Sequence, residues 1–487
     1  MGCKTNEYCV FDFSTPEKIE SYAQKLQGMT FRDVLDLGIT PEGTTHDYSD
    51  RAFKGGVGTL IEERFFGYKA NSDQNADFAD AGVELKTTCF DVKKNGEYSA
   101  GERLVLTMIP MNKPIEDDFY SSHAWDKSSK IMLIYYQRDK SIDKYDQQIK
   151  YVSMFTPPEE DLKIIEHDYE VIRDLVQSGK AEELSESLTT YLGACTKGAN
   201  EATMWVEQFY PPHNKAKKRA FCFKRQYMDY VLHHYIMNEK RSDSIISNVS
   251  DLENMTFEEL VLHKINSHIG KTDRELCQML EIPYTGNKAQ WTTITYSLLG
   301  VRGDKAEEFE KANISVRTVR IEETDTVKES LSLDSFKFKE LIEEDWDNAP
   351  LHNYFEETRF LFVSFRKKNS HLYLAGARFW AMPQVDINGP LYQCWKRTRD
   401  VVRAGVEFSV VPWGGSERIE NNLPKKTGNP VAHVRPHTAK SWYRFSDGTC
   451  RGENPAYGDE LPDGREMTKQ SFWLNSDYIY SIVSTSK

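Results

Sequence analysis

Residues 77–86 read DFADAGVELK, and this stretch sets two carboxylates and a lysine at a spacing that suits metal-dependent chemistry on phosphodiesters. Its last residues alternate between hydrophobic and charged, which predicts a short strand with Glu84 and Lys86 on one face. Asp77 lies just upstream, in the turn or strand that leads in. A hard divalent cation prefers oxygen ligands, and Asp77, Glu84 and the backbone carbonyl of Leu85 supply three. Lys86 would then orient the attacking water or offset developing charge.

The spacing alone does not identify a site. An acidic residue followed two positions later by a lysine is common, and it usually marks a solvated strand face. Short motifs of this kind also arise often by chance. The rest of the chain therefore has to decide between a catalytic centre and an exposed strand.

The composition is that of a globular protein with more than one domain. At ~150 residues a domain, 487 residues predict two or three domains. No apolar run approaches the ~20 residues needed to span a bilayer, and the first residues lack a signal-peptide pattern. We therefore expect a cytoplasmic, bacterial-type intracellular protein with no membrane association. The eight cysteines form no C-x-x-C pair, so neither a zinc site nor a disulfide framework is indicated.

The charge balance restricts how the protein can bind nucleic acid. A net charge of -13 argues against indiscriminate coating of nucleic acid, because non-specific affinity comes from neutralising phosphates. It leaves a specific binder possible. Residues 215–225 are basic with interleaved aromatics and include Lys217, Lys218 and Arg219. A DNA-binding segment and a solvated loop running into a strand explain this pattern equally well.

The chain consists of two related halves. Residues 76–87 match residues 307–318 in pattern, with Glu84 replaced by Ser315 and Lys86 by Arg317. Three further matches follow the same order: 58–67 with 291–300, 173–179 with 399–405, and 220–231 with 471–482. A polar stretch between the halves is the natural linker. We therefore predict a catalytic domain at 1–238, a linker at 239–254 and a non-catalytic copy at 255–487.

Each half follows the same predicted order of elements. Helices come first, then strands around 83–87 and 131–136, then a helix, a loop and a strand. In the first half, apolar residues recur at three- and four-residue steps from Leu162 to Val176, which predicts a helix closed by Gly179. The fold class is therefore α/β (α+β), a mixed sheet flanked by helices.

These segments resemble MutH, the methyl-directed mismatch-repair endonuclease, and the MutH-like type II restriction endonucleases that cut at GATC. The stretches LQGMT at 26–30, KGGVGTLIE at 54–62 and residues 77–87 match the MutH pattern in order and at similar spacing. The resemblance to MutH covers about residues 17 to 235. The whole length, with a degenerate second half, resembles the Sau-type GATC restriction enzymes, with further similar stretches at 184–200, 433–438 and 467–478.

The resemblance implies two tandem MutH-like domains of the PD-(D/E)xK endonuclease fold, with Mg²⁺ as the cofactor. The implied catalytic centre is Asp77, Glu84 and Lys86. Glu62, on the preceding helix, matches a carboxylate that supports the metal site. Lys127 matches a further active-site lysine. Without the resemblance, Glu62 would be an ordinary helix carboxylate and Lys127 a solvated surface lysine.

The resemblance also implies DNA contacts. Lys54 matches a lysine near the DNA backbone, and Lys197 a lysine on a loop that enters the major groove; either would otherwise be a solvated surface lysine. The family has an arginine two residues before Lys197, where this chain has Cys195, so the loop departs from the family in how it reads guanine. Arg435 and His437 form either a DNA-reading loop of the second half or a turn packed by proline.

The counterpart of Lys127 in the second half falls near Glu356, and this reversal of charge fits a copy without activity. The second half would then bind another GATC copy and promote assembly. Because one centre cuts one strand at a time, cleaving both strands of a palindrome requires a DNA-induced dimer or two sequential events. A cognate DNA methyltransferase would act on the same site and need not bind the protein.

The expected activity is that of a type II restriction endonuclease that recognises double-stranded GATC and leaves 5′-phosphate ends. A mismatch-repair-type nicking endonuclease is the nearest alternative, and the duplicated length argues against it. A DNA-binding regulator that kept the fold without the chemistry is another. The intact set of Asp77, Glu84 and Lys86 argues against that alternative.

Overall fold

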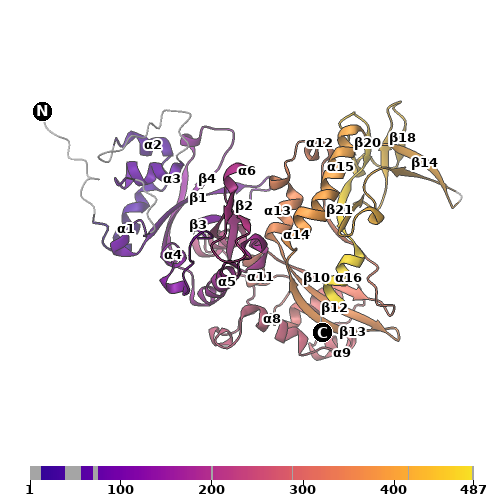
Figure 1. Cartoon of the computed structure of the whole chain (residues 1–487), viewed down its shortest axis with the longest axis horizontal. Helices are drawn as coiled ribbons and strands as arrows, with labels where there is room; N and C mark the ends of the chain where they lie inside the picture. The colour runs from indigo at the N-terminus through magenta and orange to yellow at the C-terminus, as the bar shows by residue number, and fades with distance from the viewer. Residues whose placement is uncertain are drawn as a thin grey trace. The chain divides into compact units, whose positions relative to one another are not determined.

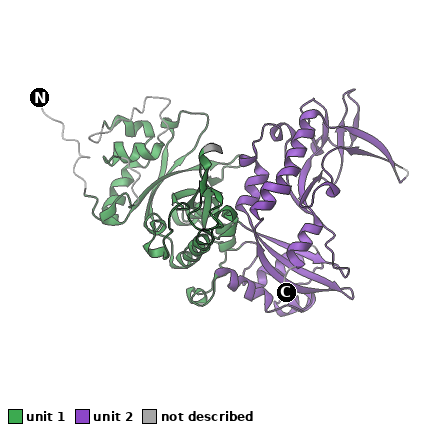
Figure 2. Cartoon of the chain, in the orientation of Figure 1, with its two compact units in different colours: residues 1–256, 306–313 green, residues 257–305, 314–487 purple. Residues whose placement is uncertain are grey.

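The computed structural model describes residues 12–38, 56–69, 75–198, 201–287, 289–414 and 416–484. Lys54 lies outside the described residues. The chain forms two compact units, which are described separately (Figure 2). Unit 1 comprises residues 1–256 together with 306–313, and unit 2 comprises residues 257–305 together with 314–487. Within the described ranges, no helix combines the length and the apolar character that crossing a membrane requires.

Unit 1 is built on a mixed four-stranded sheet in the order β2-β1-β4-β5 (Figure 1). Its strands are β1 (Glu84–Val92), β2 (Tyr98–Ala100), β4 (Ile131–Gln137) and β5 (Ile149–Phe155). β1 runs parallel to β4, and the other pairs are antiparallel. A second sheet, in the order β3-β9-β6, contains β3 (Leu104–Met108), β6 (Leu192–Thr196) and β9 (Arg219–Phe223), and β7 (Trp205–Glu207) pairs with β8 (Lys215–Lys217).

Helices cover the sheets of unit 1. They are α1 (Pro16–Ala23), α2 (Phe31–Asp36), α3 (Val57–Leu60), α4 (His123–Asp126), α5 (Glu159–Gln177), α6 (Glu201–Met204), α7 (Arg225–Tyr230) and α11 (Glu307–Ala312). The predicted helix is α5, which buries Ile165, Tyr169 and Val176. It ends where Gly179 adopts φ +66, a conformation that favours glycine. The prediction of a mixed sheet flanked by helices is confirmed.

One hydrophobic core fixes the orientation of β1. The apolar faces of α1, α2 and α3 pack against β1, β4 and β5 (Figure 1). Val83 and Leu85 point into this core, being 0% and 4% exposed. Because side chains alternate along a strand, Glu84 and Lys86 lie on the opposite face.

Unit 2 repeats this plan. β10 (Ile314–Ile321) runs parallel to β12 (Arg359–Lys368), which pairs with β13 (His371–Trp380). A second sheet, in the order β11-β21-β16, contains β11 (Leu331–Ser335), β16 (Ala432–Pro436) and β21 (Gln470–Leu474). The remaining strands are β14 (Phe408–Trp413), β15 (Ser416–Asn421), β17 (Trp442–Arg444), β18 (Cys450–Gly452), β19 (Gly458–Glu460) and β20 (Glu466–Thr468). Its helices are α8 (Phe257–Asn266), α9 (Asp273–Met279), α10 (Gln290–Leu298), α12 (Phe338–Leu341), α13 (Pro350–Glu357), α14 (Gln384–Asp386), α15 (Tyr392–Ala404) and α16 (Ser476–Ser484).

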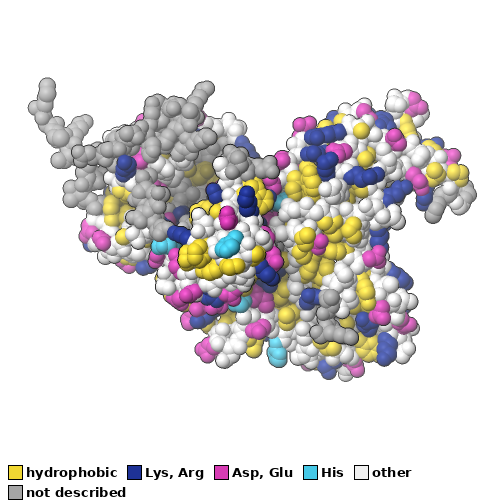
Figure 3. Space-filling view, viewed as in Figure 1, with side chains coloured by type: hydrophobic (Ala, Val, Ile, Leu, Met, Phe, Trp, Pro, Cys, Tyr) yellow, Lys and Arg dark blue, Asp and Glu magenta, His cyan; other side chains and the backbone are white. Residues whose placement is uncertain are grey.

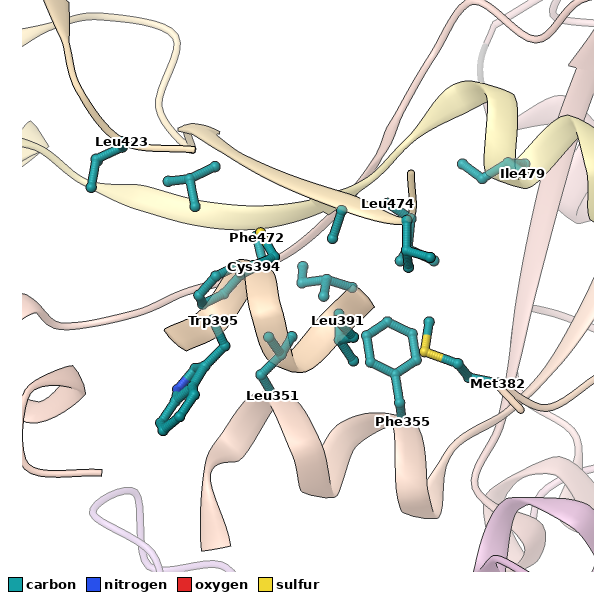
Figure 4. Close-up of a cluster of buried hydrophobic side chains, with 14 of the residues drawn as sticks. Leu351, Phe355, Met382, Leu391, Cys394, Trp395, Leu423, Phe472, Leu474 and Ile479 are labelled. Carbon is teal, nitrogen blue, oxygen red and sulfur yellow. The ribbon is translucent and has the colours of Figure 1, made fainter. Parts of the chain in front are cut away.

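The core of unit 2 lies between α13, α15 and the second sheet (Figure 4). α15 contributes Cys394, Trp395 and Val402, and the preceding turn contributes Leu391. Leu391, Trp395 and Val402 recur at steps of four and seven residues, the spacing of one helix face, and all three are buried. α15 therefore plays the part in unit 2 that α5 plays in unit 1.

Strand register aligns the two copies residue by residue. Glu84 lies opposite Ile131 in unit 1, and Ser315 lies opposite Phe360 in unit 2. Lys127 precedes Ile131 by four residues, and Glu356 precedes Phe360 by four. The register therefore places Glu356 at the position of Lys127.

Helix α11 lies in a different unit from the one that the sequence predicted. It belongs to the second half by pattern, within the predicted domain 255–487, yet it packs in unit 1 against α7. Its sequence, EEFEKA, is typical of an exposed helix, but Glu307, Glu308 and Lys311 are only 8%, 2% and 1% exposed. Periodicity cannot reveal this packing, because the buried contacts are made by charged side chains.

Lys311 occupies a polar and aromatic cage in unit 1. Its Nζ lies 2.8 and 3.0 Å from the two carboxylate oxygens of Asp161 and 2.7 Å from Glu307. It also lies over the rings of three tyrosines, at 4.8 Å from Tyr230, 5.6 Å from Tyr191 and 5.7 Å from Tyr235. The ammonium group is therefore paired, although it is almost fully buried.

Glu308 occupies the position that corresponds to Asp77, seven residues before Ser315 as Asp77 is seven before Glu84. Its carboxylate accepts hydrogen bonds from the Ser244 hydroxyl at 2.5 Å and from the backbone N–H groups of Ile245 and Ile246 at 2.9 and 3.1 Å. The second half has kept an acid at this position, where it fixes the segment that follows the first half.

Candidate active site

A tight loop brings Asp77 and Glu84 together. The backbone N–H of Phe78 donates to Val83 O at 2.9 Å, and that of Val83 donates to Phe78 O at 3.3 Å. Between them, the chain makes one turn of 3-10 helix at Ala79–Ala81 and reverses at Gly82, whose φ of +61 favours glycine. The loop closes because Phe78 and Val83 are both buried in the core.

Asp77 and Glu84 are joined through the backbone of this loop. The N–H of Leu85 donates to Asp77 Oδ2 at 2.9 Å, and the N–H of Asp77 donates to Glu84 Oε2 at 3.3 Å. Both carboxylates therefore lie at the start of β1, on the side facing away from the hydrophobic core.

Two lysines hold Glu84. Lys86 Nζ lies 2.7 Å from Glu84 Oε1, and Lys127 Nζ lies 2.9 Å from Glu84 Oε2. Lys127 also donates to the carbonyl of Asn75 at 2.5 Å. The side chain of Glu84 is 3% exposed, so its charge is shielded from water but paired on both oxygens. The structure thus brings together three residues that lie on two different elements.

Glu62 and Asp77 complete an acidic cluster. Glu62 lies on the π-helical turn Ile61–Phe65 that continues α3, and Leu60 and Ile61 anchor this turn in the core. Burial, and then repulsion from Glu84, raises the pKa of Asp77 to about 6. Burial, and then repulsion from Asp77, raises the pKa of Glu62 to about 7. The lysines do not fully offset this crowding of negative charge.

The residues present fit a divalent cation. Asp77 and Glu84 supply two carboxylates and Leu85 a backbone carbonyl, the hard oxygen ligands that such ions prefer. The crowding that raises the pKa values of Asp77 and Glu62 is what a bound cation would relieve. No cluster of three or more His, Cys, Asp or Glu side chains suited to a metal occurs in the described part of the chain. The set here has two such side chains and a carbonyl.

The basic residues predicted to contact DNA fall into two groups. Lys197, Lys217 and Lys218 are half-buried, and they lie on the loop after β6 and on the β8–β9 segment. The backbone N–H of Lys197 donates to Lys218 O at 2.7 Å, so this loop and segment are adjacent. Arg219 differs from the expectation: it is 3% exposed and donates to Ala194 O at 2.7 Å. It stabilises the second sheet instead of reaching the surface, because the whole of β9 is buried between its neighbours β3 and β6.

The register of the second sheets aligns β6 and the residues after it in unit 1 with β16 and the residues after it in unit 2. Leu192 lies opposite Phe223 in unit 1, and Ala432 lies opposite Leu474 in unit 2. Counting along β6 and β16 from these pairs places Arg435 at the position of Cys195, and His437 at that of Lys197.

The two residues at this position are placed differently. Cys195 is 1% exposed and packs against Ala220 and Cys222, so it cannot reach a ligand. Arg435 is exposed, with its guanidinium 4.6 Å from the centroid of the Trp473 ring. An arginine that is missing near the end of β6 in unit 1 is thus present near the end of β16 in unit 2.

Tyr68 is a residue of this region that the sequence did not single out. It lies three residues after Phe65, where the turn that bears Glu62 ends, and its hydroxyl is buried. No spacing rule connects it to Asp77 or Glu84, so only the three-dimensional structure identifies it.

Comparisons with known proteins agree with this geometry. Residues 66–168 match the family model of the DNA mismatch repair enzyme MutH, a range that includes Asp77, Glu84, Lys86 and Lys127. The chain is 29% identical over 191 residues to the DNA mismatch repair protein MutH of Shigella boydii serotype 18, covering 38% of this chain and 77% of that protein. It is 28% identical over 191 residues to MutH of Escherichia coli O17:K52:H18, with the same coverage.

A longer match covers both halves. The chain is 35% identical over 455 residues to the type II restriction enzyme Sau3AI of Staphylococcus aureus, covering 88% of this chain and 92% of that protein. The resemblance to the Sau-type enzymes is thereby confirmed. The chain belongs to the MutH-like type II restriction endonucleases related to Sau3AI, site-specific deoxyribonucleases that bind double-stranded DNA and generally use divalent metal ions.

Proposed function

We propose that the protein recognises double-stranded GATC and hydrolyses one phosphodiester per strand with Mg²⁺, leaving 5′-phosphate and 3′-hydroxyl ends. The observation that carries this proposal is the placement of Glu84 between Lys86 and Lys127, beside Asp77 on the same loop. GATC as the target rests on the resemblance of both halves to the Sau-type enzymes.

Each side chain has a distinct part in this mechanism. Asp77, Glu84 and the carbonyl of Leu85 would hold Mg²⁺, which supplies an activated water and neutralises charge on the phosphate. Lys86, 22% exposed, is the more accessible of the two lysines and orients the attacking water or offsets developing charge. Lys127, 9% exposed, keeps the Glu84 carboxylate in place.

Glu62 supports the metal site from the π-helical turn that continues α3. It is part of the same acidic cluster, because repulsion from Asp77 and Glu84 contributes to its raised pKa. Lys197, Lys217 and Lys218 contact the DNA, and Lys54 contacts it near the DNA backbone.

The second half is proposed to bind a further copy of GATC without cutting it. Ser315 and Arg317 replace the catalytic Glu84 and Lys86, while Arg435 stands exposed where unit 1 has the buried Cys195. Arginine pairs well with the guanine edge in the major groove. On the face shown in Figure 3, Lys and Arg side chains gather over the upper part of unit 2. Binding there would promote a DNA-induced dimer.

Plasmid digestion tests the activity directly. The purified protein, with Mg²⁺, should convert unmethylated plasmid to double-strand fragments whose sequenced ends all fall at GATC and carry 5′-phosphates. Without Mg²⁺ the plasmid should stay intact. Isolated nicks at GATC would favour the mismatch-repair-type alternative, and cutting at another sequence would overturn the specificity.

Arg435→Ala tests DNA binding by the second half. Losing one arginine–guanine contact costs ~1–3 kcal/mol, about five- to 150-fold in affinity for the second site. Cleavage of a plasmid with many GATC sites should slow, and the advantage of such a plasmid over one with a single site should shrink. Arg451→Ala is the matched control, because Arg451 is also exposed in unit 2 but pairs with Glu417 at 2.8 Å. Equal site-number dependence in the parent and both variants would contradict the proposal.

A further inference from the structure

Tyr68 is fixed beside the loop that carries Asp77. Its ring packs edge-on against Phe78, with centroids 5.6 Å apart and an interplanar angle of 83°, and Phe78 directly follows Asp77. It also lies 6.4 Å from the ring of Phe66. The backbone N–H of Tyr68 donates to the carbonyl of Glu62 at 3.2 Å. Tyr68 is therefore tied both to the turn that bears Glu62 and to the loop that bears Asp77.

The hydroxyl of Tyr68 is buried and has no hydrogen-bond partner among the described residues. Three other tyrosines of unit 1 satisfy theirs: Tyr22 donates to Phe65 O at 3.1 Å, Tyr135 to Met228 O at 3.3 Å and Tyr169 to Glu116 O at 2.7 Å. Tyr191 and Tyr230 also have buried hydroxyls without a partner in the described structure, so what distinguishes Tyr68 is its place beside the loop that bears Asp77. Leaving a buried polar group unpaired costs ~1–3 kcal/mol. An unpaired buried group therefore needs an explanation, and a catalytic role is one of those that apply.

The surroundings of this hydroxyl keep it protonated. Burial is the main cause that raises the pKa of Tyr68, and repulsion from Asp77, Glu62 and Glu84 adds to it. Tyr68 is thus a neutral donor at every pH at which a nuclease works. The three carboxylates are near enough to influence the hydroxyl, yet none of them accepts its proton in a hydrogen bond.

A neutral donor suits this place better than another cation would. The reacting phosphate of DNA brings non-bridging oxygens to the metal-binding carboxylates, and these oxygens accept hydrogen bonds. A donor fixed by aromatic packing does not need to reorganise when charge accumulates on such an oxygen in the transition state.

We propose that Tyr68 is a further substrate-contacting residue of the nuclease centre, whose hydroxyl donates a hydrogen bond to a non-bridging oxygen of the scissile phosphate. This inference rests on the proposed function, which places that phosphate at Asp77 and Glu84. Because the charge on the oxygen increases as the water attacks, the hydrogen bond strengthens in the transition state. Its loss should reduce kcat more than it weakens DNA binding.

Tyr68→Phe is the test, because it removes only the hydroxyl and keeps the ring. We expect kcat at saturating DNA and Mg²⁺ to fall about ten- to hundredfold, the range for one hydrogen bond to a charged group. Affinity for a GATC duplex, measured without metal by fluorescence anisotropy, should change less than about twofold. The melting temperature of the metal-free protein should stay the same or increase, because the variant removes a buried unpaired group.

Tyr22→Phe is the matched control in the same aromatic cluster. Tyr22 lies 5.7 Å from Phe66, but its hydroxyl is bonded to Phe65 O. This variant should lower the melting temperature and leave kcat unchanged. The opposite pattern, a Tyr68→Phe protein that melts lower or cuts as fast as the parent, would overturn the inference.

Asp77→Asn, assayed in parallel, separates this inference from the function on which it rests. If Asp77→Asn cuts DNA like the parent, the proposed centre itself is wrong. If Asp77→Asn is inactive while Tyr68→Phe has the kcat of the parent, only the assignment of Tyr68 fails.

Discussion

Asp77→Asn should abolish DNA cleavage and leave the protein folded. The asparagine side chain keeps an oxygen that can accept the hydrogen bond from Leu85 N–H, which Asp77 accepts at 2.9 Å. The loop should therefore retain its shape. The variant lacks the negative charge that would bind the cation, and metal-assisted stabilisation of the transition state is worth several kcal/mol. We expect cleavage of plasmid GATC sites to slow by about a thousandfold or more.

Asp80→Asn is the control for this substitution. Asp80 lies in the same loop, but it is exposed and no resemblance assigns it to the site. It should cut plasmid at the parental rate. Circular dichroism and thermal melting would show that both variants fold. An Asp77→Asn protein with parental activity would refute the assignment of the centre. An inactive Asp80→Asn protein would indicate that the metal site lies at another position in the loop.

Lys311→Met should destabilise unit 1 by about 3–5 kcal/mol, the cost of leaving a buried charge without its partner. Asp161 is 1% exposed and bonds Lys311 through both carboxylate oxygens. Methionine fills a similar volume but supplies no charge. Urea denaturation followed by the fluorescence of unit 1 would measure the loss. Adding Asp161→Asn should restore part of the stability, because it removes the unpaired charge.

The pH dependence of this variant follows from the pKa of Asp161. Burial raises it to about 6 even in the presence of Lys311, which lowers it. The titratable groups facing Asp161 are Lys311, Glu307, Tyr227, Tyr191 and Tyr235. An acid whose folded pKa lies above its unfolded value of 3.8 takes up its proton first in the folded state.

Without Lys311, the pKa of Asp161 should rise further. The loss in free energy of unfolding that Lys311→Met causes should therefore be largest above pH 7. It should shrink as the pH falls through the folded pKa of Asp161 towards 4, because the folded state then takes up the proton that removes the charge. A deficit that stays constant between pH 5 and 8 would show that the lost stability comes from packing and not from the charge on Asp161.

Some parts of this site follow from the sequence by simple rules. The alternation around Glu84 and Lys86 predicted the strand and its polar face, since Val83 and Leu85 had to be buried. The buried face of α5 and the glycine that ends this helix were also predicted from the sequence. The position of Lys127 beside Glu84 could not be predicted from a local pattern, because the two residues are separated in sequence and only the resemblance to MutH connected them.

Other parts depend on packing that no local pattern encodes. Arg219 was expected at the surface, but its place on β9 directs it inward to Ala194 O. Tyr68 carries no motif, and its relevance lies in a hydroxyl without a partner in the described structure. The charged sequence of α11 is typical of an exposed helix, whereas complementary charges and tyrosine rings surround it in the structure.

Helix α11 also determines when the catalytic unit is complete during synthesis. The first half ends before residue 257, yet unit 1 includes residues 306–313. A nascent chain that has emerged only as far as the linker has Asp161 buried without Lys311, and Ser244, Ile245 and Ile246 without the Glu308 carboxylate. We therefore expect unit 1 to complete its packing only after part of the second copy has been synthesised. A chain that ends in the linker should accordingly form an incomplete unit 1 and not a free-standing nuclease.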